Sequence, residues 1–324
     1  MTAREEARLT VHDLVTLGEV LLRLSLPSPE RFETARRLDV QIGGAEANVA
    51  VAAARLGLRV AWISALPDNA WGERVRRELT GHGVDCGGVR MVAGTRLGLY
   101  FLEYGAPPRP IRVLYDRRDS AFARLGPDDV DWAPVRRARI VHLSGITPAL
   151  GAPSRALVER AIAEAGEISF DLNYRATLWS PDDARAFAGV VLPRARYLFI
   201  GAEEAQTVFG LTGAAPAVLE ALARLAPKAT IALMLGADGC TVLDGGRLLR
   251  PRRRYDVQVI DPIGAGDAYV GGFLWATLQG QTVEDAIDAG QAVAALKCSI
   301  WGDIALVTPR DVDDLLSGGP SVRR

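Results

Sequence analysis

Short apolar runs alternate with helical patterns along most of this 324-residue chain. The runs are rich in Val, Ile, Leu and Phe, which is typical of strands that are buried on both faces. The alternation predicts an α/β/α sandwich, in which helices cover both sides of a doubly wound, mainly parallel sheet. Strands are expected at residues 14–18, 59–65, 140–144, 168–172, 197–201 and 230–235. Helices are expected at residues 45–56, 71–82, 154–165, 181–192, 202–209, 217–225, 265–278 and 283–296.

Two segments break this order, residues 22–41 and 95–121, and both have the pattern of short β pieces with turns. In a parallel α/β chain we expect such pieces to form a small separate sheet, a β lid over one end of the core. The alternative is an irregular surface excursion. The core would then comprise residues 14–21, 42–94 and 122–316. Residues 1–13 and 317–324 are expected to be loose extensions.

Composition argues against several classes of protein. The formal net charge of -1 argues against a nucleic-acid binder that works through bulk positive charge. No apolar run approaches the roughly 18 residues of a membrane span, and the N-terminal residues lack the apolar core of a secretory signal. The three cysteines lie far apart and fit buried thiols in a reducing compartment. We therefore expect a cytoplasmic protein that binds neither nucleic acid nor membrane.

Several motifs of well-known enzyme classes are absent. The chain contains no GxxxxGK(S/T) phosphate loop, no GxGxxG fingerprint, and no HExxH, HRD or GxSxG. P-loop NTPases, nicotinamide oxidoreductases, zincins, protein kinases and α/β-hydrolases therefore lose their main support. The three histidines share no ligand spacing, which predicts no zinc site. Only two of the 38 basic residues, Lys228 and Lys297, are lysines, a bias that we attribute to the coding preference of the source genome.

The sharpest motif is DPIGAGD at residues 261–267, between a β-like run at 255–260 and a helical pattern. Small residues at a helix start leave the backbone N–H groups of Gly264, Ala265 and Gly266 open to a phosphate oxygen. Asp267 would lie beside them in the first helical turn, where a carboxylate could accept a hydroxyl proton as the oxygen attacks phosphorus. The alternative is an ordinary helix N-cap preceded by a glycine turn.

Two further segments carry candidate binding residues. Gly44 and Asn48 are four residues apart at the start of a helix and share one face, where they could hold a polyhydroxy ligand. The alternative there is a tight turn before a buried Ala-rich helix. Tyr115 and Arg117 end the second β excursion and could close over a ligand. The alternative for them is a charged edge strand.

Arg175 follows a buried strand, at the edge where open α/β sheets bind ligands. Its fork of donors could clamp a carboxylate or a phosphate. The alternative is a surface ion pair with Asp171 or Asp182, which would contribute little to stability.

Taken together, these segments resemble the ribokinase-like sugar kinases, also called the phosphofructokinase-B family. GGAEANVAVAAARLG at 43–57 is similar to the family's N-terminal signature. DPIGAGDAYVGGF at 261–273 is similar to its C-terminal signature, with Pro262 where Thr is usual. The pairing of both signatures, about 220 residues apart, is far more specific than either alone. The resemblance extends over nearly the whole chain and implies the ribokinase-like fold.

Within the family, four stretches resemble the 2-keto-3-deoxygluconate kinases: GLYFLEYG at 98–105, YDRRDSA at 115–121, HLSGITPAL at 142–150 and FDLNYRATLWS at 170–180. ALKCSIWGD at 295–303 is similar too, with Trp301 where Pro is usual. This resemblance implies an ATP-dependent enzyme that phosphorylates the C6 hydroxyl of 2-keto-3-deoxy-D-gluconate. Lids of this family often pair between subunits, which implies a homodimer.

The resemblance also implies roles for individual residues. Asp267 would be the catalytic base, and the N–H groups from Gly264 through Ala265 and Gly266 to Asp267 would form the anion hole. The sugar would be held by Gly44, Asn48, Tyr100, Tyr115, Arg117 and Arg175. The ATP pocket would be lined by Asn173, Gly236, Asp238 and Gly239. Mg²⁺ would travel with the ATP phosphates, and Asp261 would support a monovalent cation such as K⁺.

One departure from the family concerns the outer magnesium shell. Many relatives place Asn-x-x-Glu near the phosphates, and here Glu204 matches but Gly201 stands in place of the Asn. Alternative functions remain: a fructokinase, a ribokinase, a 5-keto-2-deoxygluconate kinase, or a non-catalytic ligand-binding protein on the same fold. Asn173 argues against the last of these kinases, which tends to have Asp there, and Asp267 argues against a non-catalytic protein. The sequence does not separate the gluconate from the galactonate epimer.

Overall fold

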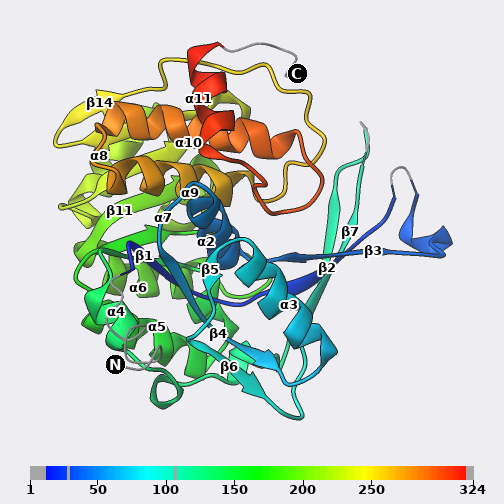
Figure 1. The fold of residues 1–324 in the computed structure, drawn as a ribbon. Helices are drawn as coiled ribbons and strands as arrows, with labels where there is room; N and C mark the ends of the chain where they lie inside the picture. The colour runs from blue at the N-terminus through cyan, green and yellow to red at the C-terminus, as the bar shows by residue number, and fades with distance from the viewer. Residues whose placement is uncertain (1–11, 28–29, 106–107, 319–324) are drawn as a thin grey trace.

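The structure, a computed structural model, describes residues 12–27, 30–105 and 108–318 (Figure 1). Its centre is a ten-stranded sheet with the order β14-β13-β12-β11-β10-β9-β1-β4-β5, in which β6 pairs with the carboxyl end of β4. The strands from β12 to β5 are parallel, and β13 and β14 run antiparallel at one edge. The strands are β1 Leu14–Leu17, β4 Val60–Pro67, β5 Val84–Asp85, β6 Val89–Val92, β9 Ile140–Ser144, β10 Ile168–Asp171, β11 Ala195–Gly201, β12 Thr230–Met234, β13 Cys240–Asp244 and β14 Arg247–Leu249.

Helices cover both faces of this sheet because its strands carry buried apolar side chains on both faces. Along β1, Leu14 belongs to one buried cluster while Val15 and Leu17 belong to the other, as the alternation of side chains along a strand requires. The helices on the first face are α2 Ala45–Arg55, α3 Ala70–Gly81, α9 Ala265–Leu278, α10 Val283–Cys298 and α11 Pro309–Ser317. Those on the second are α4 Ala133–Arg137, α5 Ala152–Glu164, α6 Pro181–Val191, α7 Ala202–Phe209 and α8 Ala215–Leu225. The predicted α/β/α sandwich with a mainly parallel sheet is confirmed.

The two predicted β excursions meet in a second, four-stranded sheet, here called the small sheet, with the order β3-β2-β7-β8. Its strands are β2 Leu21–Ser25, β3 Asp39–Gly43, β7 Gly98–Glu103 and β8 Arg112–Asp116. β2 follows almost directly on β1, so the small sheet grows from the carboxyl end of a core strand and projects away from the core (Figure 1). Leu114 and Tyr115 are exposed on its outer strand, β8. The action of this sheet as a lid, and the division into core and lid, stay predictions.

Some predicted segments differ from the structure. The run at residues 255–260 is not a strand; its last N–H group, on Ile260, donates to the carbonyl oxygen of Cys298 at the end of α10 (2.8 Å). The hairpin of β13 and β14, which the apolar pattern did not predict, extends the sheet instead. His12 and Asp13, within the expected loose extension, are buried, whereas residues 1–11 and 319–324 lie outside the described residues. No helix in the described parts of the chain combines the length and hydropathy of a membrane span.

Helix α9 is buried almost all round, which explains why it lacks a polar face. Two adjacent glycines allow this close packing. A Cβ atom on Gly271 would lie 2.5 Å from Cβ of Ala52 on α2, and one on Gly272 would lie 2.8 Å from Cγ2 of Val293 on α10. The first turn of α9, which carries the predicted base, is therefore fixed by helices on two sides.

We predict that Gly271→Ala destabilises the protein by about 1–3 kcal/mol, because the added methyl group overpacks a rigid helix contact. Gly189→Ala on α6 is the matched control, since its Cβ would meet nothing within 4 Å. Removing a glycine from an open helix position should stabilise by roughly 0.5–1 kcal/mol. Urea unfolding measures both variants, and equal stabilities would contradict the packing argument.

Candidate active site

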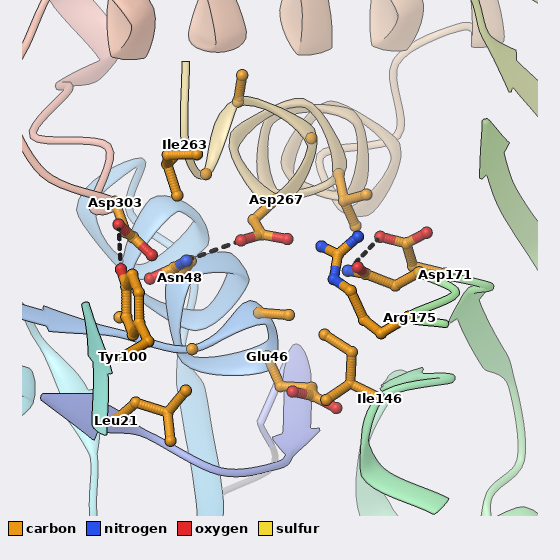
Figure 2. A pocket seen from close by; sticks show the side chains of 18 of the residues that line it. Leu21, Glu46, Asn48, Tyr100, Ile146, Asp171, Arg175, Ile263, Asp267 and Asp303 are labelled. Carbon is orange, nitrogen blue, oxygen red and sulfur yellow. Dashed lines mark hydrogen bonds between the residues drawn. The ribbon is translucent and has the colours of Figure 1, made fainter. Parts of the chain in front are cut away.

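A cavity of about 570 Å³ opens at the carboxyl ends of the parallel strands, where sheets of this kind bind ligands. Tyr100 and Tyr115 of the small sheet line one side of it. The starts of α2 and α9 and the end of β10 line the rest, so Asn48, Asp267 and Asp171 face one space (Figure 2). Segments more than 200 residues apart in the sequence thus meet in one pocket.

At the first turn of α9, the N–H group of Ala265 donates to the carbonyl oxygen of Pro262 (3.2 Å), and no side chain caps the other N–H groups. Gly264 has φ +83° and a Cβ there would lie 2.2 Å from the carbonyl oxygen of Asp303, so only glycine fits this position. No side chain caps the helix, and a Cβ on Gly266 would meet nothing within 4 Å. Gly264, Ala265, Gly266 and Asp267 all line the cavity. Free N–H groups at a helix start carry partial positive charge, so this turn can bind an anion.

Asp267 is held at the cavity by Asn48, whose Nδ2 donates to its Oδ2 at 2.7 Å (Figure 2). Burial raises the pKa of Asp267 to about 7, against the lowering effects of Asn48 and the Arg175 charge. A carboxylate of this pKa suits a general base near neutral pH. Asn48 itself is set by helix α2, where its N–H donates to the carbonyl oxygen of Gly44 (2.7 Å). The structure therefore shows Asn48 orienting Asp267, in addition to its predicted place beside a sugar.

Two more acids, Asp171 and Glu204, line the cavity at the end of β10 and the start of α7, and both are half-buried. Both oxygens of Glu204 accept backbone N–H groups, from Tyr174 and from Gly201, each at 2.7 Å. Burial raises the pKa of Asp171 well above its usual value, and the Glu204 charge adds to the rise. Asn173 sits between them with φ +40°, a conformation that Asn tolerates better than most residues, and its Nδ2 donates to Asp171 (3.2 Å). This acidic wall is suited to a divalent cation that arrives with a phosphate ligand.

The small sheet and the segment just after β8 supply three of the predicted sugar-binding residues, Tyr100, Tyr115 and Arg117. Two of these have partners that the sequence did not reveal. Tyr100 donates its hydroxyl to Asp303 (2.6 Å). Arg117 forms two hydrogen bonds with Glu19, at 2.9 and 2.5 Å, and the side chains of Arg117 and Glu19 are 10% and 2% exposed. The charge of Arg117 is thus matched within the protein, while Oε1 of Glu19 is buried without a hydrogen-bond partner. Glu19 lines the cavity and lies just past β1, a position that could have marked it in the sequence.

Arg175 differs from Arg117 because no carboxylate pairs with it among the described ion pairs. It is exposed, lines the cavity, and makes one hydrogen bond, from Nη1 to the carbonyl oxygen of Tyr174 (3.4 Å). Its guanidinium points toward Asp267 and Asp171 (Figure 2). The alternative interpretation, a surface ion pair of Arg175 with Asp171 or Asp182, is not seen within 4.0 Å among the described residues. Arg175 is therefore a cation at the cavity that is available to an anionic substrate.

Asp261 does not have the surroundings of a metal ligand. Its Oδ2 accepts hydrogen bonds from Arg23 Nη2 (2.5 Å), from the hydroxyl of Tyr104 (2.6 Å) and from the N–H of Gly302 (2.9 Å). Its carbonyl oxygen accepts one from Lys297 Nζ (2.7 Å). Two side-chain cations, Arg23 and Lys297, thus contact Asp261 where the sequence interpretation placed a monovalent metal ion, and these contacts argue against that ion. The metal role of Asp261 stays a prediction.

The predicted nucleotide turn lies apart from the cavity wall. Gly236, Asp238 and Gly239 belong to or follow a 3₁₀ turn at the end of β12, and none of them lines the cavity. Asp238 is exposed there. Met234 and Phe199, from the neighbouring strand ends, do line it. The nucleotide role of the turn stays a prediction. Among the described residues, no group of three or more His, Cys, Asp and Glu side chains is arranged to hold a metal ion.

Residues 11–309 match the family described as pfkB family carbohydrate kinase, and the chain belongs to this family. It is 42% identical over 311 residues to the 2-dehydro-3-deoxygalactonokinase of Haloferax volcanii, with 95% of this chain and 97% of that protein covered. It is 35% identical over 309 residues to the 2-dehydro-3-deoxygluconokinase of Thermoproteus tenax, with 94% of each covered. The crystal structure of 2-dehydro-3-deoxygluconokinase from Thermotoga maritima matches with a TM-score of 0.89 at 32% identity, over 94% of this chain and 99% of that one.

These comparisons confirm the predicted family, the ribokinase-like fold and the class of enzyme, a carbohydrate kinase. A putative ribokinase II from E. coli, solved with ATP and Mg²⁺, shares the fold with a TM-score of 0.87 at 19% identity, over 95% of this chain and 100% of that one. Membership in a kinase family removes the nicotinamide oxidoreductase alternative.

We predict that Asp267→Asn raises the melting temperature at pH 8 by several degrees. The folded protein retains the Asp267 proton up to about pH 7, whereas an unfolded Asp releases it near 3.9. Stability is therefore lost as the pH rises from about 4 to about 7, and Asn avoids that loss. Thermal unfolding from pH 4 to pH 8 tests this. A difference between variant and wild type that does not grow with pH would show that Asp267 has no raised pKa.

Proposed function

We propose that this kinase transfers the γ-phosphoryl group of ATP to the C6 hydroxyl of 2-keto-3-deoxy-D-gluconate, giving the 6-phosphate and ADP. The observation that carries the proposal is the joint presence, in one cavity, of Asp267, the open first turn of α9 and the exposed guanidinium of Arg175. The names of the two relatives at 42% and 35% identity support the same substrate class.

In this mechanism the protein mainly positions groups and stabilises charge, as is general for phosphoryl transfer. Asp267 Oδ1 accepts the C6 hydroxyl proton while Asn48 holds the other oxygen. The N–H groups of Gly264, Gly266 and Asp267 receive the equatorial oxygens of the transferring phosphoryl group. Arg175 binds the C1 carboxylate of the sugar acid. Gly44, Tyr100 and Tyr115 shape the wall around the hydroxyl groups.

ATP and Mg²⁺ are the proposed cofactors. The acidic wall of Asp171, Asn173 and Glu204 fits a magnesium ion held through water, because its oxygens face the cavity beside the anion-binding turn. When bound, Mg²⁺ would neutralise phosphate charge there. Both oxygens of Glu204 already accept N–H groups, so it would act through water rather than as a direct ligand.

The galactonate epimer is a second candidate substrate, because the relative at 42% identity is named a 2-dehydro-3-deoxygalactonokinase. We further propose a homodimer joined through the exposed strand β8, with Leu114 and Tyr115 at the contact. The proposed location is the cytoplasm, in keeping with the free thiols of the three cysteines. Analytical ultracentrifugation of wild type and Leu114→Glu tests the dimer.

An ADP-release assay with Mg-ATP tests the function against a panel: 2-keto-3-deoxygluconate, its galactonate epimer, 5-keto-2-deoxygluconate, fructose, ribose and adenosine. We expect turnover only with the two keto-deoxy acids, because Arg175 favours a C1 carboxylate. Asp267→Ala should lower kcat on the order of 10²–10⁴-fold by loss of the base. Asp313→Asn, exposed on α11 and off the cavity wall, is the folded control. Preference for a neutral sugar would overturn the substrate, and a normal kcat for Asp267→Ala would overturn the base.

We predict that Arg175→Ala lowers kcat/KM for the keto-deoxy acid by about 10-fold to 100-fold, the range expected for a lost charge-assisted hydrogen bond. Its effect on KM for ATP and on the melting temperature should be small, because Arg175 is exposed and unpaired with any carboxylate. Arg117→Ala should in addition lower the melting temperature, since it leaves Glu19 buried without its partner. Arg224→Ala, exposed on α8, is the control. Equal losses for acidic and neutral sugars would remove the carboxylate role of Arg175.

A further inference from the structure

Four charged side chains are buried together directly behind the anion-binding turn. Arg23 comes from β2 of the small sheet, Lys297 from the last turn of α10, and Asp261 and Asp303 from the loops before α9 and after α10. Arg23, Lys297 and Asp261 are 0% exposed and Asp303 is 6% exposed. Isolated charges at this depth would be strongly disfavoured, so the cluster must be understood as a set of partners.

Arg23 contacts both carboxylates of this cluster. Its Nη1 contacts Asp303 and its Nη2 contacts Asp261, each at 2.5 Å. One guanidinium between two carboxylates leaves a net charge of one negative unit in the interior. Lys297 supplies the missing positive charge, with Nζ 3.9 Å from Oδ1 of Asp261. The four groups together are neutral.

The strongest contact of Lys297 is nevertheless with the backbone. Its Nζ lies 2.7 Å from the carbonyl oxygen of Asp261, a closer approach than to the carboxylate. An ammonium group is a compact point charge, so on a single carbonyl oxygen it acts much as a bound monovalent ion would. The other contacts of Asp261 fix the same peptide: its N–H donates to Cys298 (3.2 Å) and its Oδ1 accepts the N–H of Ile263 (3.0 Å).

This fixed peptide determines where the anion-binding turn begins. Only Pro262 and Ile263 separate Asp261 from Gly264, where the chain takes φ +83° and α9 starts. A shift of the Asp261 carbonyl group would therefore move the N–H groups that receive the phosphoryl oxygens. Misplacement on this scale is costly in reactions that depend on alignment.

We propose that Lys297 is a positioning residue that serves as a built-in monovalent cation: its ammonium group holds the Asp261 carbonyl group behind the anion-binding turn, so the enzyme aligns this turn without K⁺ or another monovalent metal ion. The inference rests on the proposed function for its kinetic readout, and thermal unfolding provides a readout that is independent of activity.

The test compares wild type, Lys297→Ala and Lys228→Ala in buffers whose only monovalent cation is tetramethylammonium, K⁺ or NH₄⁺ at equal ionic strength. Wild type should keep its kcat within twofold in all three. Lys297→Ala should lose about 10-fold to 100-fold in kcat in tetramethylammonium, as outer-shell partners generally do, and should recover at least about 10-fold with K⁺ or NH₄⁺. Lys228, the other lysine, is exposed, and its variant should behave as wild type.

Two further variants separate a positional role from a general structural one. Lys297→Met fills the space without a charge, so neither K⁺ nor NH₄⁺ should rescue it. Lys297→Gln keeps a donor for the carbonyl oxygen of Asp261 and should fold if Lys297→Ala does not. The melting temperature of Lys297→Ala should rise with added KCl, because an ion that binds the folded state stabilises it, and that of wild type should not.

Activation of wild type by K⁺ of fivefold or more would overturn the inference. So would full activity of Lys297→Ala in tetramethylammonium, or equal rescue of Lys297→Met and Lys297→Ala. If no sugar of the panel is turned over, the proposed function fails, and the KCl dependence of the melting temperatures still decides the role of Lys297. If Lys297→Ala stays unfolded in every salt, a kcat of Lys297→Gln equal to that of wild type overturns the inference, and a reduced kcat with an unchanged fold supports it.

Discussion

The buried guanidinium of Arg23 joins the parts of this protein that must stay in register. It extends from β2 of the small sheet and pairs with Asp261 and Asp303, which flank the start and the rear of the anion-binding turn. Tyr100 and Tyr104, from β7 and just after it, donate to the same two carboxylates. The small sheet and the first turn of α9 are thus connected through one cluster of buried charges.

Several carboxyl groups at or near the cavity are buried at a cost to the stability of the fold. Burial raises the pKa of Asp171, of Asp267 and of Glu46, so each of these side chains would be better solvated outside the fold. Glu46 is compensated by the hydroxyl groups of Ser144 and Thr147. Asp267 has only the amide of Asn48. Burial outweighs this one amide and raises the pKa of Asp267 to about 7.

The sequence was sufficient to predict those parts of the site that are formed by residues close together in the chain. The turn at Gly264 to Asp267 was predictable because small residues and an acid at a helix start have a direct physical meaning, and the strand ends that carry Arg175 follow from the apolar pattern. Arg23, Glu19 and Asp303 were missed as site residues because their roles come from pairing across the fold. Arg23 and Asp261 are 238 positions apart, and nothing local marks them as partners. The run at 255–260 was wrongly predicted as a strand because an exposed extended segment has the same residue pattern as a paired one.

Lysine usage offers a signal that was available and was interpreted only as a coding bias. In a chain whose basic residues are nearly all arginine, one of two lysines is fully buried against a carbonyl oxygen. The contrast with Arg23 explains why the two cations are not interchangeable. A planar fork can bridge two carboxylates, as Arg23 does, but its five donors could not all be satisfied beside a single carbonyl oxygen at the end of α10. The compact ammonium group of Lys297 meets that geometry, so the physical requirement of the site, and not the overall preference for arginine, determines the residue there.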